Sequence, residues 1–285
     1  MKLFPFAIIL CLLSCQKVEL PQPDEPEECG VIDITEKDKI AVTGESLNVG
    51  PVSADIYLYT NSAEQLFVSD ALSNRASIQY CTDGLFANGK DVMPEYVREE
   101  NGQKKCFDGN RATVRLDCLT PGTKYHYRAH VVIGNASRYG KVRTFTTPAL
   151  DLPSGMVDLG LSVKWSSSNV DGQFKQNELS NVVPEGCHVP TIQEFQELID
   201  NCICAAAIID GKNGLVATAP NGKSIFFLSI APKYDGQNGV APIGNGEAFN
   251  GSYWCAEEGF AFTFGKKPNV GKTDINYYRS LRVVQ

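Results

Sequence analysis

The sequence predicts a mainly β fold with two domains, a β-sandwich over residues 30–149 and an α+β domain over residues 156–285, joined by a linker at residues 150–155. Three observations predict this fold. The 285 residues exceed one average domain of about 100–200 residues. Apolar and polar residues alternate along several short runs in the first half, as in half-buried strands. The second half contains one helical pattern, which begins at a capping box.

Composition and charge narrow the class of protein. Hydrophobic residues make up 43% of the chain and charged residues 21%, which excludes a disordered chain, a collagen and a coiled coil. The formal net charge is −7 at pH 7, whereas nucleic-acid-binding domains usually carry a basic surface. We therefore expect no nucleic-acid partner.

The first residues are typical of a signal peptide, predicted over residues 1–14. A positive start at Met1-Lys2 precedes eleven apolar residues, 3–13. Eleven residues are too few to cross a bilayer core, which needs about 20 in a helix. Residues 12–15, Leu-Leu-Ser-Cys, resemble the lipobox of bacterial lipoproteins. This resemblance implies that Cys15 is lipidated and anchors the chain in a membrane through its N-terminal lipid.

An acidic, proline-rich tether is predicted over residues 15–29. Residues 16–28 contain three prolines, five carboxylates and one lysine, a composition that favours an extended chain. Two interpretations stay open for it. It is a solvated spacer, or it resembles the signal that exports some Gram-negative lipoproteins to the outer face of the outer membrane. We expect a lipid-anchored protein of the outer membrane, at the cell surface.

The first domain contains several predicted strands, at residues 55–59, 76–81, 113–117, 124–131 and 139–147. The clearest is 124–131. One of its faces is predicted to enter the core and carries Tyr125, Tyr127, Ala129 and Val131. The opposite face is predicted to meet water and carries Lys124, His126, Arg128 and His130.

Residues 119–129 resemble the corner between strands E and F of a fibronectin type III domain. The resemblance implies that Tyr125 is the corner tyrosine, whose hydroxyl bonds back to the backbone. Residues 80–83 and 145–148 match the family as well. The chain departs from it in two respects, since it lacks the tryptophan of strand B and has a long segment at residues 84–110.

One helix and one hairpin are predicted in the second domain. Thr191 and Glu194 form a capping box. The residues at helical spacing behind it form one apolar face and are Ile192, Phe195, Leu198, Ile199 and Cys202. Asn221-Gly222 predicts a hairpin between strands at residues 215–220 and 223–228, and strands are expected to resume at Tyr253.

Several segments of this domain resemble a bacterial paralogous-repeat domain of the C-type-lectin-like fold, which is distantly similar to formylglycine-generating enzymes. The matching segments are residues 157–165, 186–191 with 194–195, 220–225, 253–254 and 281–284. The formylglycine-generating enzymes use a cysteine pair near the C-terminus, where this chain has only Cys255. The resemblance therefore implies the fold without the oxidase chemistry.

Other catalytic and metal-binding patterns are weak. A serine hydrolase needs a histidine, and the second domain has only His188, which we interpret as structural. His126 and His130 would lie about 13 Å apart on a strand, too far to share one ion. Cys202 and Cys204 have no partner pair at zinc-finger spacing. We expect no enzyme activity, no catalytic residue, no metal and no cofactor.

Calcium-dependent sugar binding is not predicted. The triplet Gln22-Pro23-Asp24 lies in the tether, and Cys255 follows Trp254 where C-type lectins continue Trp-Asn-Asp. A calcium-free site is predicted in the loop at residues 231–252, because aromatic faces stack on sugars and amides bond hydroxyls. Its candidate residues are Tyr234, Asp235, Glu247, Asn250 and Trp254. Trp254 as a core residue is the favoured interpretation of that position.

These observations predict a non-catalytic binding protein of the cell envelope, for adhesion or for capture of a ligand such as a glycan or an envelope protein. The alternative is a structural or accessory subunit of a surface assembly, whose second domain docks a protein partner.

The cysteines divide evenly between the domains. Of the ten, Cys11 lies in the signal peptide and Cys15 is the lipidation site. The remaining eight are Cys29, Cys81, Cys106, Cys118, Cys187, Cys202, Cys204 and Cys255. Each set of four allows three full pairings, and the sequence does not choose among them. Cys118 and Cys202 are also interpreted as buried thiols.

Overall fold

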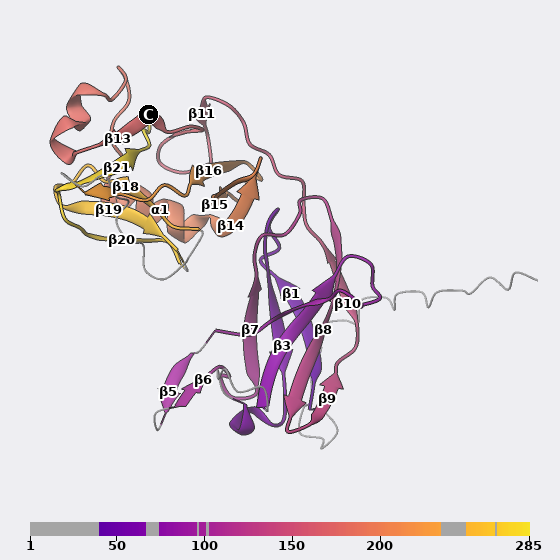
Figure 1. Ribbon diagram of the computed structural model, residues 1–285. Coiled ribbons are helices and arrows are strands. Elements are labelled where there is room, and N and C mark those ends of the chain that lie inside the picture. The colour runs from indigo at the N-terminus through magenta and orange to yellow at the C-terminus, as the bar shows by residue number, and fades with distance from the viewer. Residues whose placement is uncertain (1–39, 67–73, 96, 101–102, 235–248, 266) are drawn as a thin grey trace, which may run out of the picture. The chain divides into compact units, whose positions relative to one another are not determined.

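The computed structural model describes residues 40–66, 74–95, 97–100, 103–234, 249–265 and 267–285 (Figure 1). The lipidation site Cys15, the tether and Cys29 lie outside these residues. Within the described part of the chain, no helix combines the length and the apolar character needed to span a membrane.

A two-sheet β-sandwich forms the first half of the described chain. One sheet has the order β1-β2-β7, with β1 Val42–Leu47, β2 Ala54–Tyr59 and β7 Arg111–Leu116. The second contains β10 Arg143–Thr146, β8 Lys124–Ile133, β3 Asn74–Cys81 and β4 Lys90–Val92, with β9 Ala136–Tyr139 paired to β8. All these strand pairs are antiparallel. The predicted mainly β fold is confirmed.

Alternating residues of both sheets fill one core between them. In β2, Ala54, Ile56 and Leu58 are fully buried, and the residues between them are half-buried. In β8, the predicted inward set is buried throughout and consists of Tyr125, Tyr127, Ala129 and Val131. Burial of such apolar side chains is the main stabilising contribution to a sandwich of this kind.

The predicted tyrosine corner is present. The backbone N–H of Thr120 donates to the Tyr125 hydroxyl at 2.8 Å. The Tyr125 ring stacks on Phe145 of β10, with centroids 5.5 Å apart. The corner therefore ties the turn before β8 to the start of that strand, as the resemblance to a fibronectin type III domain implies.

His130 corrects the prediction for the outer face of β8. It was expected to face water, but it is only 5% exposed. Its ring stacks on Tyr139 of β9 at 4.6 Å, and its Nδ1 lies 2.9 Å from Asp91 Oδ1 of β4. β9 and β4, which belong to the same sheet, cover the His130 side chain. The alternation of residues along β8 cannot indicate that neighbouring strands bury one of its side chains.

The connections of the sandwich also differ from the prediction. The last predicted strand, 139–147, is two strands, because β9 ends at Tyr139 and β10 begins at Arg143. The long segment after β3 contains β4 and a hairpin of β5 Arg98–Glu100 and β6 Gln103–Lys105 (Figure 1). A short 3₁₀ helix, η1, spans Ala63–Gln65.

The second half of the described chain is an α+β arrangement of short strands and one α-helix. A six-stranded sheet contains β13 Val170–Phe174, β21 Tyr277–Leu281, β18 Gly251–Trp254, β19 Phe260–Phe264 and β20 Asn269–Lys272, with β17 Lys233–Tyr234 paired to β21. A three-stranded sheet contains β14 Ile203–Ile209, β15 Lys212–Thr218 and β16 Ser224–Leu228. The remaining elements are β11 Met156–Val157, β12 Trp165–Ser166, the 3₁₀ helix η2 Gln176–Asn181 and α1 Ile192–Asn201.

Buried aromatic rings form the core of this half. Phe195 of α1 stacks on Phe262 of β19 at 4.6 Å and also contacts Trp165, at 5.1 Å. Phe227 and Tyr253 complete the group, with centroids 5.2 Å apart. All five rings are fully buried. They join the helix to both sheets in one core.

The predicted helix start and hairpin are confirmed. Thr191 Oγ1 accepts from the Glu194 N–H, and Glu194 Oε2 accepts from the Thr191 N–H at 2.7 Å. Asn221-Gly222 joins β15 to β16, with Gly222 at a φ of +84°. A second hairpin, β14 to β15, was not predicted. Its turn residues Asp210 and Gly211 both have positive φ, as a type I′ turn requires.

The cysteines in the described residues are all free thiols. Cys118 is exposed, so its interpretation as a buried thiol is wrong; its φ of +55° places it in a turn after β7. Cys202 is half-buried at the end of α1. The limits of the two domains and the C-type-lectin-like fold of the second stay predictions.

Candidate functional site

Two short strands bring together aromatic residues that are far apart in the sequence. β17 pairs antiparallel with β21, so that Tyr234 lies opposite Tyr277 and Lys233 opposite Tyr278. Residues that pair in this way share one face of a sheet. Tyr234 is 39% exposed, and its ring meets the Tyr277 ring edge to face, with centroids 5.0 Å apart. We call these four residues the aromatic edge.

A buried arginine supports this edge from within. Arg279 lies two residues after Tyr277 on β21 and is 4% exposed. Its guanidinium lies over the Tyr277 ring at 5.1 Å and over the Trp254 ring at 5.0 Å. Nη1 donates to Ser252 Oγ at 2.8 Å, and Nη2 donates to Thr273 Oγ1. Burial lowers the pKa of Arg279, although the nearby Tyr277 and Asp274 oppose this effect.

The opposite face of the edge is positively charged. Tyr278 and Lys233 point to this face, and the ammonium of Lys175 lies 5.4 Å from the Tyr278 ring centroid. A cation over an aromatic ring is a favourable contact that orients both groups. One face of the strand pair therefore carries the rings of Tyr234 and Tyr277. The opposite face carries Lys233 and the Tyr278 ring, with Lys175 next to that ring.

Trp254 does not belong to the exposed part of this site. It is 0% exposed and packs with Leu179, Leu281 and Val283. Its Nε1 donates to the Phe174 carbonyl at 2.7 Å. A fully buried ring has no face to offer a ligand, so Trp254 takes the core role and leaves the set of candidate ligand-binding residues.

The other candidates of the loop are only partly described. Asn250 is half-buried and directly precedes β18. Asp235 and Glu247 lie outside the described residues. Tyr277 and Tyr278 were not predicted as site residues, because nothing local in the sequence indicates that their strand pairs with Tyr234.

His188 has a structural position, as interpreted from the sequence. Its backbone exchanges two hydrogen bonds with Val284, of 2.9 and 3.0 Å. Its Nε2 lies 2.9 Å from Glu194 Oε1. Burial raises the pKa of Glu194, but hydrogen bonds from Thr191 and His188 outweigh this and hold the pKa below its ordinary value. His188 thus joins the start of α1 to the last residues of the chain.

One serine, one aspartate and one histidine meet in the sandwich, but their connection is not catalytic. Ser77 Oγ donates to Asp91 Oδ1 at 2.7 Å, and His130 Nδ1 lies 2.9 Å from the same oxygen. A nucleophilic serine must donate to the histidine, which the aspartate then orients. Here the aspartate lies between the other two, and the network holds β3, β4 and β8 together.

The described ranges, 40–66, 74–95, 97–100, 103–234, 249–265 and 267–285, contain no metal-binding cluster. No group of three or more His, Cys, Asp or Glu side chains there could hold a metal ion.

Comparisons with known proteins give no family. No protein-family model matches the chain, and neither does any curated protein. The sensor domain of the anti-sigma factor RsgI4 from Pseudobacteroides cellulosolvens is 18% identical, covers 39% of this chain and 96% of its own, and has a TM-score of 0.28. A fibronectin type III domain of human KIAA0970 protein is 13% identical, covers 39% of this chain and 74% of its own, and has a TM-score of 0.26. The fibronectin type III domain of human fibronectin type III domain containing protein 3 is 13% identical, covers 43% of this chain and 94% of its own, and has a TM-score of 0.23. At these scores the likenesses carry no argument, and the sandwich is assigned from its own strands and corner.

Proposed function

We propose that this chain is a lipid-anchored protein of the outer membrane that binds a ligand through the aromatic edge, without catalysing a reaction. The observation that carries the proposal is the exposed Tyr234 ring, held edge to face against Tyr277 by the β17–β21 pairing. A tyrosine combines an apolar face with a polar tip and suits a ligand that has both kinds of surface. The lipobox resemblance at residues 12–15 supports the anchor.

A glycan is the ligand class that we propose. Sugar rings carry an apolar face of C–H groups, which stack on tyrosine, and hydroxyls, which need hydrogen-bonding partners. Tyr234 supplies the first kind of contact, and the hydroxyls of Tyr234 and Tyr277, which share one face of the strand pair, supply hydrogen-bonding groups. Binding at a surface-exposed edge of an anchored protein would serve adhesion or capture of the glycan at the cell surface.

Four of the described thiols have pKa shifts that disfavour a nucleophilic role. Burial raises the pKa of Cys255 to about 12, with a further increase from Glu257. Burial likewise raises the pKa of Cys106 to about 11 and those of Cys202 and Cys204 to about 12. A nucleophilic cysteine needs the opposite shift, toward the thiolate.

The test is binding of residues 16–285 to an array of immobilised glycans, with and without EDTA. We expect binding that EDTA leaves unchanged and that Tyr234→Ala weakens about tenfold, because loss of a central aromatic contact costs more than about 1 kcal/mol. Tyr139→Ala is the matched control, since Tyr139 is a similarly exposed tyrosine on the sandwich. Equal binding by both variants, or no glycan bound at all, would contradict the proposal.

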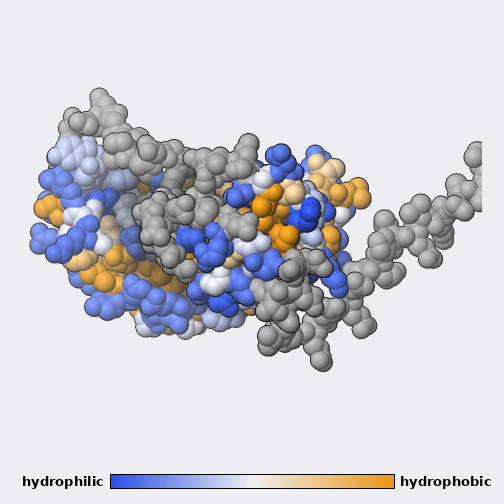
Figure 2. Space-filling model, turned by 90° about the horizontal axis from the view of Figure 1, so that it is seen from below, coloured by the Kyte–Doolittle hydropathy of each residue, from blue (hydrophilic) through white to orange (hydrophobic). Residues whose placement is uncertain are grey.

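One observation favours the alternative, an accessory subunit that docks a protein partner. Three large apolar side chains between β3 and β6 are exposed, Leu85, Met93 and Val97. Figure 2 shows that apolar surface, in orange, gathers in patches on the face seen there. Exposed apolar patches are common at protein interfaces. Co-purification of a single envelope protein, lost on Leu85→Asp and kept on Tyr234→Ala, would favour this alternative.

A further inference from the structure

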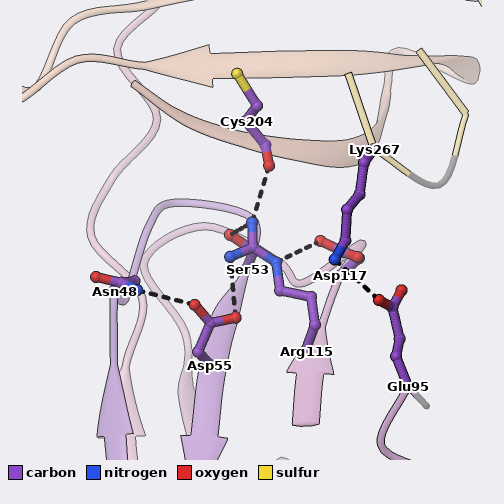
Figure 3. Close-up of polar contacts among 8 residues, drawn as sticks. All are labelled: Asn48, Ser53, Asp55, Glu95, Arg115, Asp117, Cys204 and Lys267. Carbon is purple, nitrogen blue, oxygen red and sulfur yellow. Dashed lines mark hydrogen bonds and ion pairs between the residues drawn. The ribbon is translucent and has the colours of Figure 1, made fainter. Parts of the chain in front are cut away.

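Arg115 links the sandwich to the three-stranded sheet of the second half of the chain (Figure 3). It lies on the outer face of β7, opposite Asp55 of β2. Its Nη1 donates to Asp55 Oδ1 and its Nε to Asp117 Oδ1, both at 3.1 Å. Its Nη2 donates to Ser53 Oγ and to the backbone carbonyl of Cys204, both at 3.0 Å. The planar guanidinium thus holds three groups of the sandwich and one of β14.

The charges around Arg115 fix it in this position. Burial lowers its pKa, but the two carboxylates beside it more than offset this and raise the pKa above its ordinary value. Burial raises the pKa of Asp117, and Arg115 offsets only part of that shift. Asn48 donates to the second oxygen of Asp55 at 2.9 Å (Figure 3). The arginine therefore stays charged and oriented, and the second N–H of its Nη2 reaches β14.

A second hydrogen bond runs beside the first. The N–H of Cys118 donates to the carbonyl of Ala206 at 3.1 Å. Cys204 and Ala206 lie two residues apart on β14, which is one of the two edge strands of its sheet. Their carbonyls point to the same side, away from β15, where an edge strand leaves such groups unpaired. The sandwich therefore supplies donors to two carbonyls at the open edge of β14.

Apolar contacts accompany these hydrogen bonds. Val52, in the turn between β1 and β2, is buried in one cluster with Ala205, Ala207 and Val216. Gly50 lies so close to Ile203 that an added Cβ would come within 3.3 Å of its side chain. At the periphery, Lys267 Nζ lies 3.2 Å from Glu95 Oε2, an exposed pair that adds little stability (Figure 3).

We infer that the sandwich and the domain that follows it form one rigid body, and that Arg115 is the residue that locks their interface. The predicted linker at residues 150–155 would by itself allow the domains to reorient, as is usual for small interfaces within a chain. The paired edge of β14 and the buried Val52 remove that freedom. This inference does not depend on the ligand proposed above.

The test is amide ¹⁵N relaxation of a protein that spans residues 16–285. This range contains the whole compact unit Ile34–Gln285, to which all described residues belong. We expect one rotational correlation time for the amides of both domains. In Arg115→Ala, amides of the second domain should report a shorter time than those of the wild type. Hydrogen exchange of the Cys118 amide should become on the order of tenfold faster, as expected when a hydrogen bond is lost.

Two further variants keep the test decisive. Val52→Asp disturbs the interface without touching Arg115 and should have the same effect. Arg128→Ala is the matched control, because Arg128 is a partly buried arginine of the same sandwich that bonds to Gln79 and not to β14. Core amides with unchanged chemical shifts establish that each variant is folded. Two different correlation times in the wild type, or one shared time in both interface variants, would overturn the inference.

Discussion

Removal of the Tyr125 hydroxyl tests the tyrosine corner, which connects sequence and fold most directly. Tyr125→Phe deletes one oxygen and leaves the ring against Phe145 and Tyr80, at centroid distances of 5.5 and 5.9 Å. The buried apolar surface is therefore unchanged. The variant loses only the hydrogen bond from the Thr120 N–H, of 2.8 Å.

The expected cost follows from the surroundings of that bond. A hydrogen bond contributes about 0.5–1.5 kcal/mol to stability, and a buried donor left without a partner costs about 1–3 kcal/mol. Thr120 is exposed, so water reaches its freed N–H and the lower range applies. If both domains unfold together, each kcal/mol lowers the Tm by about 2–4 °C. We expect Tyr125→Phe to lower the Tm by about 1–6 °C.

The assay is urea denaturation of residues 16–285 followed by far-UV circular dichroism, with a thermal scan beside it. The midpoint should fall at an unchanged m-value, because the folded state keeps its compactness. Tyr139→Phe is the control, since this tyrosine is 49% exposed, and we expect a change within about 0.5 kcal/mol. Equal effects of the two variants would refute the role of the hydroxyl, and a loss above about 3 kcal/mol would show that the ring itself had moved.

Three further predictions concern the anchor, the helix start and the thiols. Labelled fatty acid should enter the wild-type chain and not Cys15→Ala, and equal labelling would exclude lipidation at this residue. Glu194 has a folded-state pKa below its ordinary value of 4.5, so it stabilises the fold above that pH, and this contribution is lost as the pH falls through the folded-state pKa. Glu194→Gln should therefore lose less stability than the wild type between pH 7 and pH 3, measured as urea midpoints; parallel profiles would show that Glu194 does not contribute. Iodoacetamide at pH 8 should modify exposed Cys118 well before buried Cys255, whose pKa is about 12, and peptide mass spectrometry that finds the reverse order would contradict the described burial.

The elements that could be predicted from the sequence are those whose cause lies within a few residues. Alternation along 124–131 predicted which side chains of β8 enter the core, and the capping box predicted where α1 begins. Asn221-Gly222 predicted its hairpin because the turn conformation depends on those two residues. Asp210-Gly211 carries the same kind of signal, and the β14–β15 hairpin was predictable from it.

The candidate site was predictable only in part, because its residues come from distant strands. Tyr234 was predicted from its place in a glycine-rich loop, but the strand pairing of β17 with β21 supplies its neighbour Tyr277. Tryptophan is a residue type that can stack on sugars, and only the packing around Trp254 shows that its ring is buried. Burial depends on which elements cover a position, and that information is not local.

The sequence by itself therefore determined the mainly β fold class, the tyrosine corner and the start of the helix, since alternation, capping and turn chemistry act over short distances along the chain. The tertiary structure alone decided the burial of His130, the partners of Tyr234 and the interface at Arg115. The guanidinium of Arg115 and the carbonyl of Cys204 are 89 residues apart in the sequence. No local pattern specifies such a contact, because it forms only when the open edge of one sheet meets a charged side chain on the outer face of another.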